Sequence, residues 1–330
     1  MQRYIVHRLL AAIPVLFIVA VFIFGLLHVA GGDPAAIIAG KDAPQWQIEE
    51  IRKSLGLDRP LYVQLGIWFR DLSQGNLGKS ITSKIPVMKL IRDRLTPSLS
   101  LAVLVELMVL PISIPLGVLA AWKANTWIDR SIMVFASLGF SIPVFFLGFL
   151  MIFAFALRID GLPGSLPLIP DGIRIGWHIP AAGYVPIQED FGRYLIRLIM
   201  PAAAVAIVFM AFLTRMTRAT VIEVLREDYI RTARAKGLTE TKVLVRHALK
   251  NAMLPIMTVV GWGVAELLGG IVVVEQVFAI PGVGRLIIDA IVRRDYPVIQ
   301  GAMLMISLVQ VFVNLAIDLS YSFFDPRIKY

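Results

Sequence analysis

Two glutamates lie inside long apolar stretches of this sequence, where a charged side chain is costly. Glu106 falls well within the apolar run 97–122, and Glu266 lies near the middle of the run 253–278. Ionisable residues at such positions often line a polar path or bind an ion or a proton. They also join neighbouring helices by hydrogen bonds. The sequence leaves both interpretations open for each glutamate: contact with a substrate ammonium group or a gate residue, or attachment between helices.

Other familiar chemistries find little support in the residues. The 330-residue chain contains no cysteine, which excludes disulfides, thiolate metal sites and cysteine nucleophiles, and its four histidines are scattered. Gly78-Lys79-Ser80 looks like the end of a phosphate-binding loop, but Ser73 stands where that loop requires glycine. No nucleophile–base pair or metal-binding cluster lies within the apolar runs. We therefore expect no catalytic residue, no metal site and no cofactor bound by this chain.

The candidate residues belong to a chain with the composition of a membrane protein. Hydrophobic residues make up 58% of it and its mean hydropathy is +0.77, against about 45–50% apolar residues in a soluble domain. Six apolar stretches are long enough to cross roughly 30 Å of hydrocarbon as helices. They are 9–30, 97–122, 131–157, 195–217, 253–278 and 298–319. We predict an all-α integral membrane protein with six transmembrane helices, in which Pro111 and Pro115 can kink the second and Pro143 can kink the third.

The distribution of lysine and arginine predicts the orientation of these spans. Nine basic and four acidic residues between Arg215 and Lys250 give that stretch +5 of the formal net charge of +9. Because basic residues in short loops favour the cytoplasm, we place both termini and the segment 218–252 there. The first loop, 31–94, is too long for that rule. We expect it to form an extracytoplasmic helical cap, with helices over 45–55 and 61–72.

The segment 228–255, here called the elbow, is basic and helix-forming. Asp228 favours the N-terminus of a short helix that Gly237 can end by adopting a positive φ. Thr239 can then cap a second short helix. Two short helices that meet at a glycine form a compact knob, which suits a groove on a soluble partner. A solvated loop that only fixes topology is the alternative, and physical reasoning alone does not separate the two.

Several motifs carry a family resemblance. The run Arg231-Thr232-Ala233-Arg234-Ala235-Lys236-Gly237 resembles the EAA motif of bacterial ABC importer permeases, in which Glu-Ala-Ala is followed three residues later by Gly. Arg231 stands in place of the glutamate, and Lys250 in place of a later proline, a form typical of the peptide-permease branch. The start MQRYIVHRLL, the run EQVFAIPGVGR and the end FDPRIKY also resemble the B-type subunit of the dipeptide/oligopeptide permease family.

The resemblance implies a type I ABC importer permease fold, in which the elbow couples to an ATPase subunit. The coupling residues that it implies are Arg231, Thr232, Ala233, Gly237 and Leu238. It also implies a second, C-type permease subunit, two ATP-binding subunits that carry ATP and Mg²⁺, and a periplasmic substrate-binding protein. This chain would then be a non-catalytic inner-membrane subunit, with Glu106 and Glu266 as candidates for the translocation path of dipeptides or oligopeptides.

The predicted organisation has four parts: a tail and first span over 1–30, the cap over 31–94, a core permease domain over 95–321 that includes the coupling segment 218–252, and a cytoplasmic tail over 322–330. The rival hypothesis is a self-contained, proton-coupled secondary transporter that uses Glu106 or Glu266. Such transporters often contain inverted repeats. We find no convincing internal repeat, and the elbow would have no role in such a protein.

Overall fold

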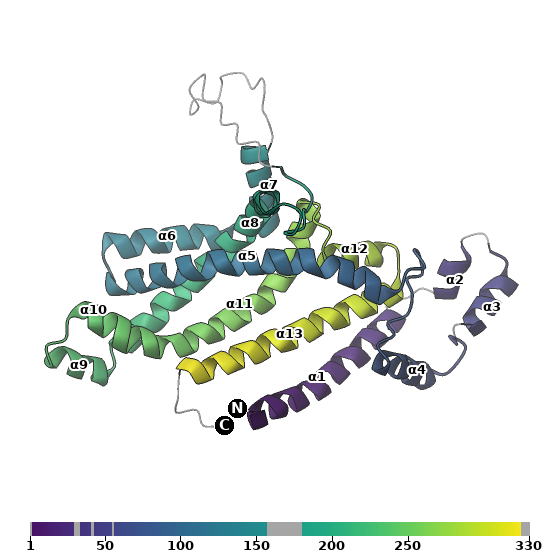
Figure 1. Ribbon diagram of the computed structural model, residues 1–330, viewed down its shortest axis with the longest axis horizontal. Coiled ribbons are helices and arrows are strands. Elements are labelled where there is room, and N and C mark those ends of the chain that lie inside the picture. The colour runs from purple at the N-terminus through teal and green to yellow at the C-terminus, as the bar shows by residue number, and fades with distance from the viewer. Residues whose placement is uncertain (1, 30–33, 41–42, 55, 157–179, 325–330) are drawn as a thin grey trace, which may run out of the picture. The chain divides into compact units, whose positions relative to one another are not determined.

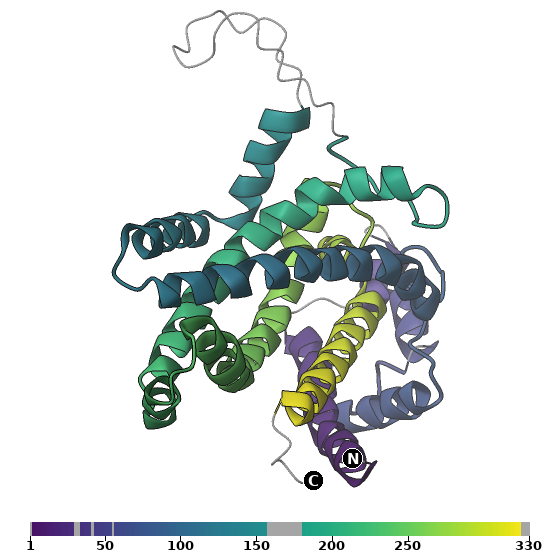
Figure 2. The ribbon, with the colours of Figure 1, turned by 60° about the vertical axis from the view of Figure 1, so that its left-hand side comes forward.

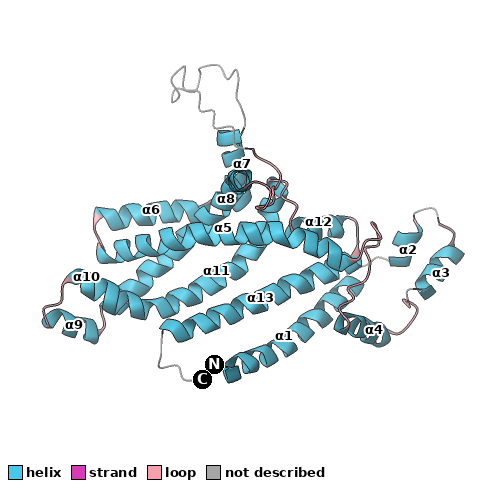
Figure 3. Ribbon diagram, in the orientation of Figure 1, coloured by secondary structure: helices cyan, strands magenta, loops and turns pink. Residues whose placement is uncertain are grey.

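Helices account for nearly all the regular structure in the computed structural model, which describes residues 2–29, 34–40, 43–54, 56–156 and 180–324. Figure 3 shows this helical character throughout the described chain. Apart from helices, the described residues form one isolated antiparallel bridge between Lys79 and Pro86. The chain divides into two compact units, Met1–Thr96 with Gly282–Ala316, and Pro97–Pro281 with Ile317–Lys329. The all-α prediction is therefore confirmed.

The first unit contains the first apolar helix and the helical cap. Its helices are α1 (Gln2–Val29), α2 (Pro34–Ala39), α3 (Gln45–Ser54), α4 (Leu61–Ser73) and α12 (Val283–Val292), together with the start of α5 (Val87–Trp122) and most of α13 (Tyr296–Phe324). The two cap helices expected over 45–55 and 61–72 are present as α3 and α4. Helix α4 packs on α1 through Phe69, whose ring stacks on Phe17 at a centroid distance of 5.0 Å.

The second unit is built around two long helices. Its elements are the rest of α5, α6 (Trp127–Ser141), α7 (Val144–Met151), the π-helix η1 (Ile152–Ala156), α8 (Phe191–Leu225), α9 (Asp228–Ala235), α10 (Glu240–Lys242), the π-helix η2 (Val243–Leu249) and α11 (Lys250–Val277). Leu101, Leu213 and Val274, from α5, α8 and α11, are fully buried in one apolar core. This core holds α5, α8 and α11 together, and these helices carry Glu106, Arg218 and Glu266.

Five helical stretches among the described residues are long and apolar enough to span a membrane, and a sixth is a bent pair. The pair joins Trp127–Ser141 to Val144–Ala156 with a bend of 97°, visible where α6 meets α7 in Figure 1. Pro143 stands at the break, as predicted, because proline cannot continue the backbone hydrogen bonds of α6. The predicted span 131–157 is thus a broken helix, and its last residue lies outside the described chain.

Helix α8 extends beyond the predicted span 195–217. It begins at Phe191 and continues to Leu225, so Arg215 and Arg218 belong to a long helix rather than to a loop. The predicted span contained Arg215 but ended before Arg218, because polar residues follow 217, although nothing there stops a helix. The elbow follows after a break of two residues, and Figure 2 shows it folded beside the ends of α8 and α11.

Candidate coupling elbow and buried charges

Helix α9 ends in a well-formed Schellman motif. Gly237 adopts φ +76°, its N–H donates to the carbonyl of Arg234 at 2.9 Å, and the N–H of Leu238 donates to the carbonyl of Ala233 at 3.4 Å. This pattern satisfies carbonyls at the helix end and needs a residue that tolerates the left-handed conformation. The predicted short helix and its glycine stop are therefore confirmed. Thr239 stands at the N-cap of α10, but its side chain makes no capping hydrogen bond.

The elbow has a small apolar core of its own. Ile230 and Val243 are fully shielded from solvent, and Ala233 and Ala248 are buried with them. Val224 and Leu225 at the end of α8, together with Leu238, pack against the same cluster. A hydrogen bond of 2.8 Å from the side-chain amide of Asn251 to the hydroxyl of Tyr229 joins α11 to α9. The elbow is therefore a folded knob attached to two long helices, rather than a solvated loop.

The outer face of the elbow is charged. The side chain of Arg231 is 76% exposed and lies 3.4 Å from Asp228. Arg234 forms two hydrogen bonds with the carboxylate of Glu240, at 2.9 and 3.3 Å. Of the residues that the EAA resemblance singles out, Arg231, Thr232 and Gly237 are exposed, Leu238 is half-buried and Ala233 packs inward. Exposed ion pairs contribute little to stability, so these charges are available to a partner.

Beside α9, the end of α8 forms an open pocket of about 520 Å³. Glu223, Glu227 and Asp228 line it together with Arg226 and two apolar residues of α8. Its acidic wall adjoins the arginines of α9. A docking partner would therefore meet both signs of charge on this end of the unit, which favours a defined orientation over non-specific attraction.

Glu106 lies partly buried in the middle of α5, where both of its carboxylate oxygens are shielded and have no hydrogen-bond partner among the described residues. Leu101, Val105 and Val109 of the same helix are buried in the apolar core. Native proteins rarely leave a buried polar atom unsatisfied. Since neither oxygen has a partner, Glu106 makes no hydrogen bond between helices with any described residue, Glu266 included.

Glu266 differs from Glu106 in its surroundings. It lies on an exposed face of α11, one turn after Trp262, whose side chain is 58% exposed. An acid at this depth of an apolar helix is costly if it faces lipid. The exposed face of α11 therefore suits a polar path or the surface of another subunit better than the hydrocarbon of the membrane.

A third glutamate was not singled out from the sequence. Glu275, near the end of α11, is fully buried, and its Oε1 accepts a hydrogen bond of 2.5 Å from the hydroxyl of Ser98 on α5. It ties α11 to α5, which is the attachment role expected of some buried acids. Glu275 falls inside the predicted span 253–278, so its position in an apolar run could have identified it as a buried acid. Its partner Ser98 lies 177 residues away, so the contact could not be predicted from the local sequence.

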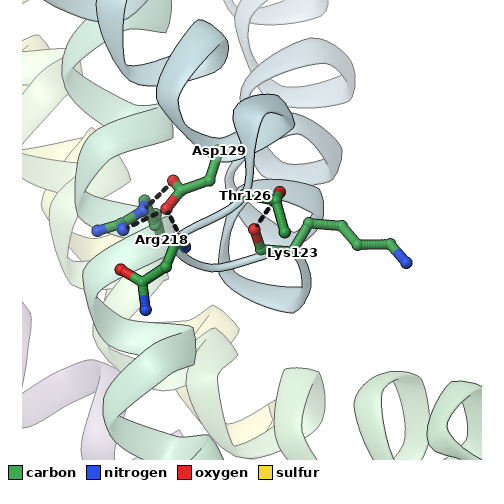
Figure 4. Close-up of polar contacts among 5 residues, drawn as sticks. Lys123, Thr126, Asp129 and Arg218 are labelled. Carbon is green, nitrogen blue, oxygen red and sulfur yellow. Dashed lines mark hydrogen bonds and ion pairs between the residues drawn. The ribbon is translucent and has the colours of Figure 1, made fainter.

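The best-defined ion pair in the second unit was also missed. Arg218 of α8 donates to both carboxylate oxygens of Asp129 on α6, at 2.5 and 2.6 Å (Figure 4). The backbone N–H of Asn125 donates to the same carboxylate at 2.9 Å, and the Asp129 side chain is only 4% exposed. Asp129 also lies in the first turn of α6, where the helix dipole favours an acid. The pair fastens α6 to α8.

The Gly78-Lys79-Ser80 loop is organised by a carboxylate. Asp295, buried in the first unit, accepts hydrogen bonds from the hydroxyls of Ser80 and Thr82 at 2.6 and 2.8 Å. The backbone N–H groups of Ile81 and Thr82 also donate to it, at 3.0 and 3.2 Å. Burial raises the pKa of the Asp295 carboxyl, but these hydrogen bonds outweigh burial and hold the pKa below its usual value. The donors that could suggest a phosphate loop are thus committed to Asp295.

Comparison with known proteins agrees with this architecture. The model of the family "binding-protein-dependent transport system inner membrane component" matches residues 113–330, and the N-terminal model of the same transport systems matches residues 1–102. The chain belongs to this family. As a member of this family it is an integral, multi-pass inner-membrane permease subunit of an ABC transporter, and it acts with the other components of a binding-protein-dependent system.

Several curated relatives of this permease align along the whole chain. It is 42% identical over 330 residues to a probable peptide ABC transporter permease protein of Sinorhizobium fredii, with all of both chains covered. It is 38% identical over 333 residues to the dipeptide transport system permease protein of Alkalihalophilus pseudofirmus, and 40% identical over 330 residues to the glutathione transport system permease protein of Escherichia coli, again with full coverage of both chains. The resemblance inferred from the sequence motifs is confirmed, whereas the self-contained secondary transporter gains no support.

Proposed function

We propose that this permease forms half of the translocation path of an ATP-driven importer of dipeptides or oligopeptides. The path would be completed by a second, C-type permease subunit, with two ATP-binding subunits at the cytoplasmic side and a substrate-binding protein at the periplasmic side. ATP and Mg²⁺ would bind the ATPase subunits. Peptide, dipeptide and glutathione permeases among the full-length relatives support a peptide-like cargo.

The folded elbow is the observation that carries the coupling role. Its apolar core joins α9 to the end of α8, and the hydrogen bond between Asn251 and Tyr229 joins it to α11. A force on the outer face of α9 would therefore be transmitted to two spans at once. ATP binding would close the ATPase pair and move the elbow, and the attached spans would turn to open the path outward. Cargo would pass inward after hydrolysis.

The two intramembrane glutamates would serve the path. Glu266 is exposed on α11, and Glu106 has buried oxygens that no described residue satisfies. A peptide ammonium group or a residue of the second permease subunit would supply the missing partner. The elbow would face the cytoplasm with both termini, as the positive-inside rule predicts.

Site-directed cross-linking tests the coupling role directly. Because the chain contains no cysteine, Arg231→Cys places one thiol of this subunit on the outer face of the elbow. We expect a thiol-reactive, photoactivatable cross-linker on Arg231→Cys to capture the ATP-binding subunit in membranes that contain the full transporter. Trp127→Cys, at the exposed start of α6 outside the elbow, is the matched control. Capture of the ATPase from the control alone would contradict the assignment.

A further inference from the structure

Packing between α6 and α8 is close at one end and open in the middle. At Gly139 of α6, a Cβ atom would lie 3.2 Å from the Cβ of Ala211 on α8, so the helices approach closely there. Towards the start of α6, an apolar groove of about 270 Å³ opens between α5, α6 and α8, with Phe135 and Met210 among its walls. Beyond that groove, α6 is attached to α8 by the polar pair of Asp129 and Arg218.

That polar attachment lies on the elbow's side of the unit. Arg218 precedes the end of α8 at Leu225 by about two helical turns, and Leu225 packs against the elbow's apolar core. The helix is unbroken between the two residues, so a displacement of the elbow is carried to Arg218. Figure 1 shows the turn between α5 and α6 at the same end of this unit as α9 and α10.

The Asp129–Arg218 pair is a bidentate ion pair that fixes the orientation of α6 relative to α8. The planar guanidinium of Arg218 uses two nitrogens on one carboxylate, which fixes orientation as well as distance. Because Asp129 also accepts the N–H of Asn125, it holds the turn between α5 and α6 as well as the start of α6. Asn125 itself adopts φ +66°, so this turn has a specific, constrained backbone. Removing one partner would leave the other charge without compensation at a partly buried site.

We propose that Asp129 and Arg218 are positioning residues for transport: they make α6 and the turn between α5 and α6 follow the elbow when the ATPase moves it. This role rests on the proposed coupling function of the elbow. Without the pair, the start of α6 has no ion pair or hydrogen bond to α8 among the described residues. The contacts that remain lie at the other end of α6, where Gly139 packs on α8 and Arg215 lies over the ring of Phe140. The start of α6 then no longer follows α8 when the elbow moves. ATP is then hydrolysed without a complete change of the path.

The test is the number of cargo molecules imported per ATP hydrolysed by the complete transporter in proteoliposomes, with its binding protein and a dipeptide. Asp129→Asn and Arg218→Gln should each lower this ratio roughly tenfold, a change typical of a lost coupling interaction. Arg193→Gln removes the same charge at the other end of α8, where Arg193 forms an exposed ion pair with Asp190, and leaves the Asp129–Arg218 pair intact, so it should keep the wild-type ratio. The amount of ATPase subunit that co-purifies should stay unchanged in all three variants.

A covalent substitute separates a mechanical link from a folding effect. In Asp129→Cys/Arg218→Cys, a bifunctional thiol reagent should restore the ratio, whereas the same reagent on either single-cysteine variant should not. The proposal is overturned if Asp129→Asn imports as many molecules per ATP as the wild type. It is also overturned if import and hydrolysis fall together with the amount of assembled complex and bridging restores neither. Absence of ATP-driven import by the wild type would instead refute the proposed function.

Discussion

Among the elbow residues, Gly237 is the one whose replacement has the most clearly predictable effect on coupling. Its φ of +76° lies in the left-handed region, and no atom lies within 4 Å of where a Cβ would be placed. Replacement by valine therefore acts through backbone strain and not through a clash with neighbours. The hydrogen bonds that close the Schellman motif, from Gly237 to Arg234 and from Leu238 to Ala233, depend on this conformation.

The backbone strain introduced by Gly237→Val is large compared with the free energies that stabilise and couple the elbow. A non-glycine residue in the left-handed conformation costs about 1–2 kcal/mol, and a β-branched residue more. Helix α9 has eight residues, a length at which an isolated helix is not stable in water. Coupling free energies between sites are typically about 1–3 kcal/mol. The strain in Gly237→Val is thus of the same size as the whole coupling, and we expect the α9–α10 turn to open and ATP-driven import to be lost.

The assay compares uptake, insertion and partner binding in one set of membranes. Gly237→Val should insert normally, because residue 237 lies outside the apolar runs, but should retain little ATPase subunit and import little dipeptide. Gly237→Asn is the matched control, since asparagine tolerates the left-handed conformation, and it should keep most of the activity. Wild-type import by Gly237→Val would refute the assignment of the elbow as the coupling element, as would equal loss in both variants.

Three further changes test other parts of the molecule. Glu106→Gln should reduce uptake of a dipeptide with a free amino terminus and leave ATPase binding unchanged. Equal uptake of the free and the N-acetylated dipeptide, in both wild type and variant, would argue against a role of Glu106 in the path. Glu266→Cys should react with a membrane-impermeant thiol reagent if the residue lines a water-filled path, whereas protection under all nucleotide conditions would contradict that placement. For Asp295, the lowered pKa means that its hydrogen bonds stabilise the fold fully above the ordinary carboxyl pKa of about 4 and lose their effect only as pH falls through the lower folded value. Hydrogen exchange at the amides of Ile81 and Thr82 should therefore stay slow from neutral pH to about pH 4, and Asp295→Ala should expose those amides at neutral pH, at a cost of roughly 1–3 kcal/mol for each donor left unpaired.

Local signals predicted the helical framework well. Long apolar runs gave the spans because a backbone in hydrocarbon must satisfy its hydrogen bonds within a helix. Gly237 predicted the end of α9, and Pro143 predicted a kink in the third span, where the structure has a break, since both effects act within a few residues of their cause. Pro111 and Pro115, which could kink the second span, lie inside the continuous helix α5. The size of the 97° bend was not predictable, because it depends on how α7 packs on distant helices.

The charged contacts escaped prediction for a different reason. Asp129 and Arg218 are 89 residues apart, and Asp295 is more than 200 residues from Ser80. Each pair forms only if two helices or loops meet in one particular register, which no local pattern specifies. Arg218 was counted among the charges of a cytoplasmic loop because the polar end of α8 resembles a loop in a hydropathy profile. Glu106 and Glu266 were found because a single acid in an apolar run is a local signal, but their roles stay predictions.

We propose that the elbow converts the work of a separate ATPase into movement of cargo through this permease. The most direct measurement is dipeptide uptake into proteoliposomes that hold the purified transporter, with Mg²⁺-ATP supplied on the elbow's side. We expect uptake that requires ATP, the ATPase subunits and the binding protein, and that persists when a protonophore abolishes the proton gradient. Uptake by this chain alone, driven by a proton gradient without ATP, would contradict it.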